Sequence, residues 1–119
     1  MDTIGDYIKI KYLIRIKQIL DEDIDGNKFI IVRTKKNKDF MREYGLNRED
    51  VKNIIKGLSI EDCFSGPEED RNPKYKGWIF KFNPMFENIM LYIKIRVENT
   101  DKSICLSVHE FGKYDKEDE

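Results

Sequence analysis

The chain has 119 residues and a mass of 14.3 kDa, which is room for one domain with one hydrophobic core. Hydrophobic residues make up 39% of the sequence and aromatic residues 12%, which favours a folded domain over disorder. No apolar run approaches the ~18 residues of a membrane span, and the N-terminus lacks a signal-peptide pattern. His109 is the only histidine, and Cys63 and Cys105 form no CxxC pair. We therefore expect a cytoplasmic protein without metal, cofactor or membrane association.

The net charge of -1 conceals two basic stretches. Residues 28–42 carry six basic side chains against one acidic side chain, and residues 71–96 carry the same numbers. Acidic groups at 21–25, 61–70 and 110–119 offset them. A polyanion senses charge within about a Debye length, ~8–10 Å, so either stretch is able to attract nucleic acid. The alternative from charge alone is an ordinary solvated surface.

The first half of the chain predicts helices, with one ambiguous segment at residues 8–20. An alternation typical of a strand is formed by Ile8, Ile10, Tyr12, Ile14 and Ile16. A stripe typical of a helix is formed by Tyr12, Ile16, Ile19 and Leu20. The pattern leaves both structures open.

A short β-branched strand is predicted at residues 29–33, and two helices follow it. Asn37 is expected to cap the first helix, which Gly45 ends. Asn47 is expected to cap the second, which Gly57 ends.

After a charged loop at residues 66–77, the sequence predicts three strands, at 78–82, 90–97 and 103–110, with a hairpin turn at 99–102. Helices followed by an antiparallel meander indicate an α+β domain, with N-terminal helices packed on one face of a C-terminal antiparallel sheet.

Alternation along the last two strands predicts one core face and one open face. The core face is expected to carry Leu91, Ile93, Ile95, Val97, Ile104, Leu106 and Val108. The open face is expected to carry Tyr92, Lys94, Arg96, Cys105, Ser107 and His109. The two strands must pair in this register, because a slip of one residue would bury Lys94 and Arg96.

The predicted open face has the groups that RNA cleavage requires. A base removes the 2′-hydroxyl proton, an acid protonates the leaving oxygen, and cations stabilise the phosphorane charge. His109 has the only side chain with an ordinary pKa near neutrality, ~6.5. Tyr75, between Lys74 and Lys76, is the better candidate for base stacking, whereas Trp78 is expected in the core. A polar face of this kind is also typical of any half-solvated antiparallel sheet.

A set of short motifs between Arg33 and His109 resembles the MqsR family of bacterial toxins, within the RelE-like mRNA interferases. The matching residues are Tyr44-Gly45-Leu46, the helix at 50–57, Leu58-Ser59, Asp62-Cys63-Phe64, Gly66-Pro67-Glu68-Glu69-Asp70-Arg71, Trp78, Leu91-Tyr92-Ile93-Lys94 and Ser107-Val108-His109-Glu110. They cover about two-thirds of the chain, and their order is more specific than any single motif.

The resemblance implies a RelE-like fold and a toxin of a type II toxin–antitoxin pair. Such a toxin is an endoribonuclease that cleaves mRNA without a metal, free or on the ribosome, and is held inactive by a cognate antitoxin protein. We assign His109 as the acid and Glu68 or Tyr92 as the base or its helper. Arg71 is placed at the catalytic phosphate.

RNA and phosphate binding is assigned to Lys94, Arg96, Lys74, Lys76 and Tyr75. One domain is expected over residues 1–112, followed by a flexible charged tail at 113–119. Two alternatives remain open: a relative that binds RNA or the ribosome without catalysis, and a protein-binding module of a mobile element.

Overall fold

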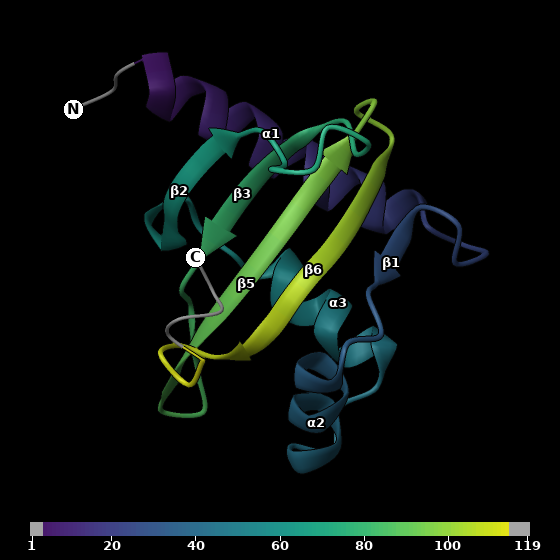
Figure 1. Ribbon diagram of the computed structural model, residues 1–119, viewed down its shortest axis with the longest axis vertical. Coiled ribbons are helices and arrows are strands. Elements are labelled where there is room, and N and C mark those ends of the chain that lie inside the picture. The colour runs from purple at the N-terminus through teal and green to yellow at the C-terminus, as the bar shows by residue number, and fades with distance from the viewer. Residues whose placement is uncertain (1–3, 115–119) are drawn as a thin grey trace.

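The computed structural model describes residues 4–114 of the protein (Figure 1). The helices are α1 (Ile4–Glu22), α2 (Lys35–Glu43), α3 (Arg48–Lys56) and a single 3-10 turn, η1 (Ile60–Asp62). The strands are β1 (Phe29–Ile31), β2 (Cys63–Glu68), β3 (Trp78–Phe82), β4 (Met85–Phe86), β5 (Ile89–Glu98) and β6 (Lys102–Glu110).

The sheet has the strand order β1-β6-β5-β3-β2, with β4 paired to β5 off this path. The α+β class, with helices first and sheet last, is confirmed. The prediction of an antiparallel sheet is wrong at one edge, because β1 runs parallel to β6 and the sheet is mixed. Residues 32–101 separate these two strands in the sequence, so no turn motif specifies their relative direction.

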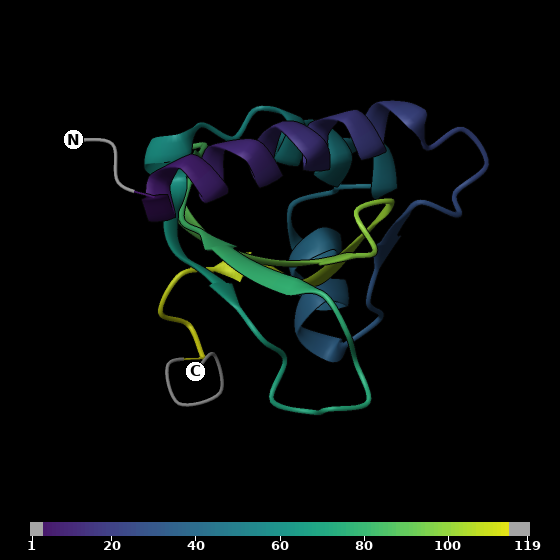
Figure 2. The same ribbon diagram turned by 90° about the horizontal axis from the view of Figure 1, so that it is seen from above.

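Two helices, α1 and α3, lie on one face of the sheet, as Figure 2 shows. Their apolar side chains pack on those of β3, β5 and β6 to form the core. The third helix, α2, packs at the end of β6 (Figure 1). We call the sheet face turned away from α1 and α3 the open face; the loop at residues 69–77 projects on that side (Figure 2).

Residues 8–20, which the pattern left undecided, belong to the helix α1. Leu13, Ile16, Ile19 and Leu20 are buried at helical spacing, while Ile14 stays exposed. A helix is favoured because it places these four apolar side chains on one face, which packs on the sheet. A strand would instead place neighbouring apolar residues on opposite faces. No helix in the described part of the chain is long and apolar enough to cross a membrane.

The predicted loop at 66–77 is shorter than expected, because β2 continues to Glu68. Pro67 lacks an N–H and is tolerated since β2 is an edge strand, paired only with β3 and with irregular register. Gly66 has φ +121°, and a Cβ there would lie 2.7 Å from the carbonyl oxygen of Ile79. The glycine therefore permits a close approach of β2 to β3.

The hairpin of β5 and β6 contains a β-bulge that the alternation did not predict. Lys94 pairs with Ser107 and Ile95 pairs with Cys105, so Leu106 is the extra residue. On the N-terminal side of the bulge, at residues 103–105, the side chains of β6 therefore point to the face opposite to the one predicted. Cys105, predicted on the open face, is therefore in the core, and Ile104 takes the opposite side.

The side-chain amide of Asn37 forms hydrogen bonds with the backbone of β6 along the edge that faces away from β5. Asn37 donates from Nδ2 to the carbonyl oxygens of Val32 (2.8 Å) and Leu106 (3.1 Å), and its Oδ1 accepts from the N–H of Val108 (2.9 Å). It was predicted as the cap of α2, but Thr34 takes that role. Asn37 thus satisfies the backbone of β6 where β1 has ended.

Replacing Asn37 with alanine is expected to lower the free energy of unfolding by about 2–4 kcal/mol, because it leaves buried backbone groups without partners. Urea denaturation measures the change, with Asn53→Ala as the matched control on the exposed face of α3. A loss no larger than that of the control would contradict this role of Asn37.

Candidate active site

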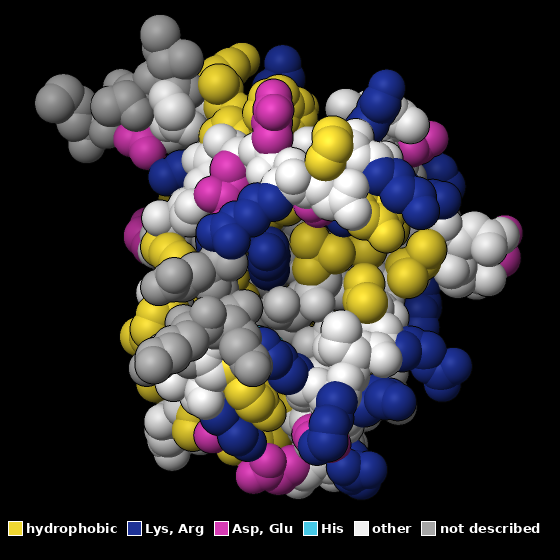
Figure 3. All heavy atoms as spheres, viewed as in Figure 1, with side chains coloured by type: hydrophobic (Ala, Val, Ile, Leu, Met, Phe, Trp, Pro, Cys, Tyr) yellow, Lys and Arg dark blue, Asp and Glu magenta, His cyan; other side chains and the backbone are white. Residues whose placement is uncertain are grey.

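The open face collects charged and aromatic side chains from four strands. Its residues, placed by strand register, are Ser65 and Glu68 of β2, Ile79 and Lys81 of β3, Tyr92, Lys94 and Arg96 of β5, and Ser107 and His109 of β6. The prediction that Tyr92, Lys94 and His109 share one face is confirmed. Figure 3 views this side of the molecule and shows Lys and Arg side chains at several places on it.

Lys94 lies near the middle of the face, directly opposite Lys81 on one side and Ser107 on the other. Burial lowers the pKa of the Lys94 ammonium, and the nearby charge of Lys81 lowers it further, against the opposing effect of Glu68. No salt bridge of Lys94 is found among residues 4–114. It is therefore a half-buried amine that releases its proton more easily than an ordinary lysine.

Glu68 forms an ion pair with Lys81, with 3.0 Å between the carboxylate Oε1 and Nζ. Its side chain stays partly open to solvent, while that of Lys81 is largely covered. The carboxylate of Glu68 thus lies close enough to Lys94 to influence its charge. A carboxylate and two ammonium groups therefore lie close together at this point of the sheet.

Tyr92 and His109 are cross-strand partners whose rings stack with centroids 5.3 Å apart and planes 27° apart. Tyr114 covers the imidazole edge-on at 4.9 Å, and Phe64 lies 6.2 Å from Tyr92. His109 is only 1% exposed, and its Nδ1 lies 3.0 Å from the carbonyl oxygen of Glu110. The expectation of an open, solvated imidazole is therefore wrong, because the C-terminal turn folds over it.

The first two residues of the predicted tail at 113–119 belong to the turn that covers His109. Lys113 forms an ion pair with Glu110 at 3.3 Å, and the Tyr114 ring packs on His109. Residues 115–119 lie outside the described residues.

Arg96 is buried and held by two carboxylates. It donates from Nη1 to Asp70 Oδ2 at 3.0 Å and from Nε to Glu98 Oε2 at 2.8 Å. The Tyr75 ring lies over the guanidinium at 4.6 Å. Arg96 therefore does not present itself to phosphate as the sequence suggested. It joins the loop at 69–77 to β5.

The remaining predicted residues lie in that loop and are exposed: Arg71, Lys74, Tyr75 and Lys76. Gly77 ends the loop with φ +122°, and a Cβ there would lie 2.3 Å from the carbonyl oxygen of Val97. Only glycine allows the chain to press against β5 at this point. The loop is thus held at one end by the ion pair of Asp70 with Arg96 and at the other by the contact of Gly77 with β5. Its basic side chains are exposed to solvent.

Sequence reasoning missed Lys81 on the open face and the exposure of Trp78, which has the same strand phase as Phe80 and Phe82. Lys81 lies between Phe80 and Phe82 of β3, and this alternation places it on the face opposite to the two rings. Trp78 was assigned to the core, but it is 40% exposed at the start of β3. The alternation of Lys81 with the two phenylalanines was visible in the sequence. That Lys81 lies beside Lys94 could not be predicted, because it depends on β3 pairing with β5.

The cysteines are free and do not form a nucleophilic site. Burial raises the pKa of the Cys105 thiol to about 12 and also raises the pKa of the Cys63 thiol. Neither is a thiolate at neutral pH. Within residues 4–114, no cluster of three His, Cys, Asp or Glu side chains is placed to hold a metal ion.

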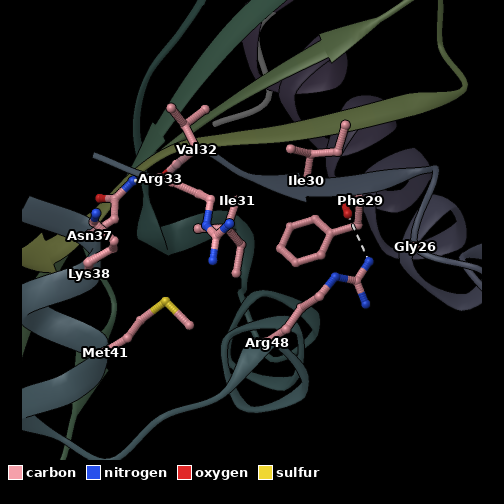
Figure 4. A pocket seen from close by; sticks show the side chains of 10 residues that line it. All are labelled: Gly26, Phe29, Ile30, Ile31, Val32, Arg33, Asn37, Lys38, Met41 and Arg48. Atoms are coloured by element: carbon pink, nitrogen blue, oxygen red, sulfur yellow. Dashed lines mark hydrogen bonds between the residues drawn. The ribbon is translucent and has the colours of Figure 1, made fainter. Parts of the chain in front are cut away.

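A hollow of about 480 Å³ lies beside β1 between α2 and α3 (Figure 4). The Phe29 ring, the Met41 side chain and the Arg33 guanidinium surround it, and Arg48 donates to the carbonyl oxygen of Phe29 at 2.7 Å. Its lining contains no acid–base pair. Comparison of the sequence with protein-family models and with curated proteins gives no match.

Proposed function

We propose that this protein is a metal-independent endoribonuclease of the mRNA interferase type, the toxin of a type II toxin–antitoxin pair. The motif order from Tyr44 to Glu110 supports the family. The observation that carries the chemistry is the group of Lys94, Lys81 and Glu68 at the centre of the open face. A cytoplasmic mRNA is the proposed substrate, and a cognate antitoxin the proposed inhibitor.

In the proposed reaction, the 2′-hydroxyl oxygen attacks the adjacent phosphorus and the bond from phosphorus to the 5′ oxygen breaks. The carboxylate of Glu68 takes the 2′ proton, and the ammonium of Lys94 gives a proton to the leaving 5′ oxygen. Lys81 stabilises the charge that develops on the phosphorane. The products are a 2′,3′-cyclic phosphate and a 5′-hydroxyl.

We assign some roles differently from our expectation from the sequence. Lys94, placed among the phosphate binders, becomes the proposed acid because its pKa is lowered and it lies at the surface of the sheet. Tyr92 and the covered His109 form the wall beside it. Arg71, whose charge acts on Lys94, and the loop residues Lys74 and Lys76 remain the proposed phosphate contacts.

Cleavage of an end-labelled single-stranded RNA in EDTA tests this function. We expect fragments that end in 2′,3′-cyclic phosphate, and no cleavage where the ribose carries a 2′-deoxy group. Translating ribosomes, which need Mg²⁺ to stay assembled, are a second substrate and are tested in a buffer that contains it. Failure to cut both substrates, or cleavage of the free RNA that requires added Mg²⁺, would refute the proposal.

A second candidate function is RNA or ribosome binding without catalysis. The cover of Tyr114 over His109 favours it, because the only imidazole is shielded from substrate. A binding protein of this kind would retain salt-dependent RNA affinity and never yield cyclic-phosphate ends. Absence of any RNA affinity would favour the protein-binding alternative, for which the hollow beside β1 is one available surface.

A further inference from the structure

We infer that the loop at residues 69–77, together with Trp78, is a subsite that binds one nucleobase of single-stranded RNA. This inference rests on the proposed RNA function and adds a place for recognition outside the cleavage centre. The loop and the start of β3 enclose a hollow of about 350 Å³, with Tyr75 and Trp78 in its lining. That volume falls within the range of small-ligand sites, ~300–1,000 Å³.

The loop is held in one shape before any ligand arrives. Its first turn is closed by hydrogen bonds from the N–H of Asn72 to Asp70 Oδ1 and from the N–H of Lys74 to Asn72 Oδ1, each 2.9 Å long. The N–H of Tyr75 then donates to the carbonyl oxygen of Asn72 at 3.0 Å. A subsite formed in advance loses less conformational entropy on binding.

Arg96 supports this subsite from below. Asp70 and Glu98 hold the guanidinium in place, and Tyr75 rests over it at 4.6 Å. A base that stacks on the outer side of the Tyr75 ring would form a stack of three groups: the base, the ring and the buried guanidinium of Arg96. The buried arginine, which the sequence suggested as a phosphate contact, is thus a positioning residue for the aromatic ring.

The chemistry of the surface favours a nucleobase over other ligands. Tyr75 is 45% exposed and Trp78 is 40% exposed, so both offer aromatic surface on which a base can stack. Lys74 and Lys76 flank Tyr75 in the chain and suit the phosphates on either side of that base. Aromatic rings interleaved with lysines are typical of proteins that bind single strands.

Glu69 adds a preference among the bases. Its carboxylate lines the hollow and makes no hydrogen bond with the residues that the structure describes. The carboxylate of Asp70 is already engaged by Arg96 and by the N–H of Asn72. Because a carboxylate accepts hydrogen bonds, the subsite favours a base with an exocyclic amino group, which offers two N–H donors, over uracil, which offers only its N3–H.

Trp78 is the only tryptophan of the chain, so its fluorescence reports directly on the subsite. The probe is a short 2′-O-methyl oligonucleotide, which the proposed chemistry cannot cleave. We expect saturable quenching by oligo(A), weaker quenching by oligo(U), and none by an abasic oligomer of equal charge. Equal quenching by the abasic oligomer, or no quenching at all, would overturn the inference.

Variants of Tyr75 locate the base. Tyr75→Leu keeps apolar bulk without the aromatic face and is expected to weaken binding roughly 5- to 150-fold, while Tyr75→Phe stays near wild type. The matched control is Tyr7→Ala, an exposed tyrosine beside a different hollow that Trp78 also borders. Loss of quenching with Tyr7→Ala, but not with Tyr75→Leu, would place the ligand against α1 and contradict the subsite.

The two proposals fail in different ways. Quenching that depends on Tyr75, without any cleavage of RNA, would support the subsite and refute the nuclease. Cleavage with no dependence of oligonucleotide binding on Tyr75 would support the nuclease and refute the subsite.

Discussion

Replacing Lys94 with alanine is expected to reduce the rate of RNA cleavage by about 10²–10⁴-fold, the usual cost of losing a general acid. The half-buried ammonium occupies the centre of the open face, opposite Lys81. Single-turnover cleavage of the labelled RNA measures the effect. Lys11→Ala, on the outer side of α1, is the matched control and should leave the rate unchanged.

The same group predicts a pH dependence. The acid works in its protonated form, so cleavage should fall as the pH rises through the pKa of Lys94. Burial and the charge of Lys81 lower that pKa, so the fall should begin below the pH at which an ordinary lysine titrates. Removing one of these causes, in Lys81→Met, should shift the fall to higher pH, because the repulsion between the two ammonium groups is lost.

His109 provides the contrast. Because its ring is buried, His109→Ala would leave a cavity and disturb the fold, so the test uses His109→Gln. If His109→Gln abolishes cleavage in a folded protein while Lys94→Ala retains it, the imidazole is the acid and our assignment to Lys94 is wrong.

Replacing Asp23 with alanine is expected to lower the free energy of unfolding by about 3–5 kcal/mol. This buried carboxylate accepts hydrogen bonds from Arg48, from Lys52 at 3.3 Å, and from the N–H groups of Lys28 and Phe29 at 2.8 and 3.1 Å. It therefore joins the end of α1 to β1 and α3. Without it, the mostly buried ammonium of Lys52 would lose its carboxylate partner at this position.

Urea denaturation measures this loss, and Asp25→Ala is the matched control in the same turn. Asp25 is exposed and accepts one hydrogen bond, from the N–H of Asn27 at 3.2 Å. We expect the control to cost less than about 1 kcal/mol. Equal effects of the two substitutions would show that the Asp23 network adds no stability.

The Asp23 network also predicts acid sensitivity. Burial alone would raise the pKa of the Asp23 carboxyl, but hydrogen bonds from Arg48, Lys28, Phe29 and Lys52 outweigh burial and hold it well below its usual range. A group whose pKa is lower in the folded state stabilises above its unfolded pKa, ~3.9, and loses that contribution as the pH falls. Stability should therefore fall below about pH 4, and less steeply in Asp23→Asn.

Local sequence signals predicted the parts of the fold that depend on neighbours in the chain. Asn47 caps α3 as predicted, and the structure adds Asp50 as its capping-box partner. The alternation of residues 90–97 predicted both faces of β5, and through its partner strand it brought Tyr92, Lys94 and His109 together. These features need only the geometry of one turn or one strand.

Distant contacts changed the candidate site. The bulge at Leu106 moved Cys105 into the core, and no composition signal announces one extra residue in a strand. The carboxylates of Asp70 and Glu98 engaged Arg96, and the ring of Tyr114 covered His109. Each of these effects depends on which segments meet after folding.

The sequence by itself determined that this chain forms an α+β domain and that cations, a tyrosine and a histidine share one sheet face. It determined them because capping residues and side-chain alternation act within a few residues. Only the tertiary structure decided that residues 8–20 form a helix, that β1 joins β6 in parallel, and that the side chain of Lys94 stays partly exposed while that of His109 is buried. Those outcomes depend on burial, and burial is set by the surfaces that cover each residue, which come from elsewhere in the chain.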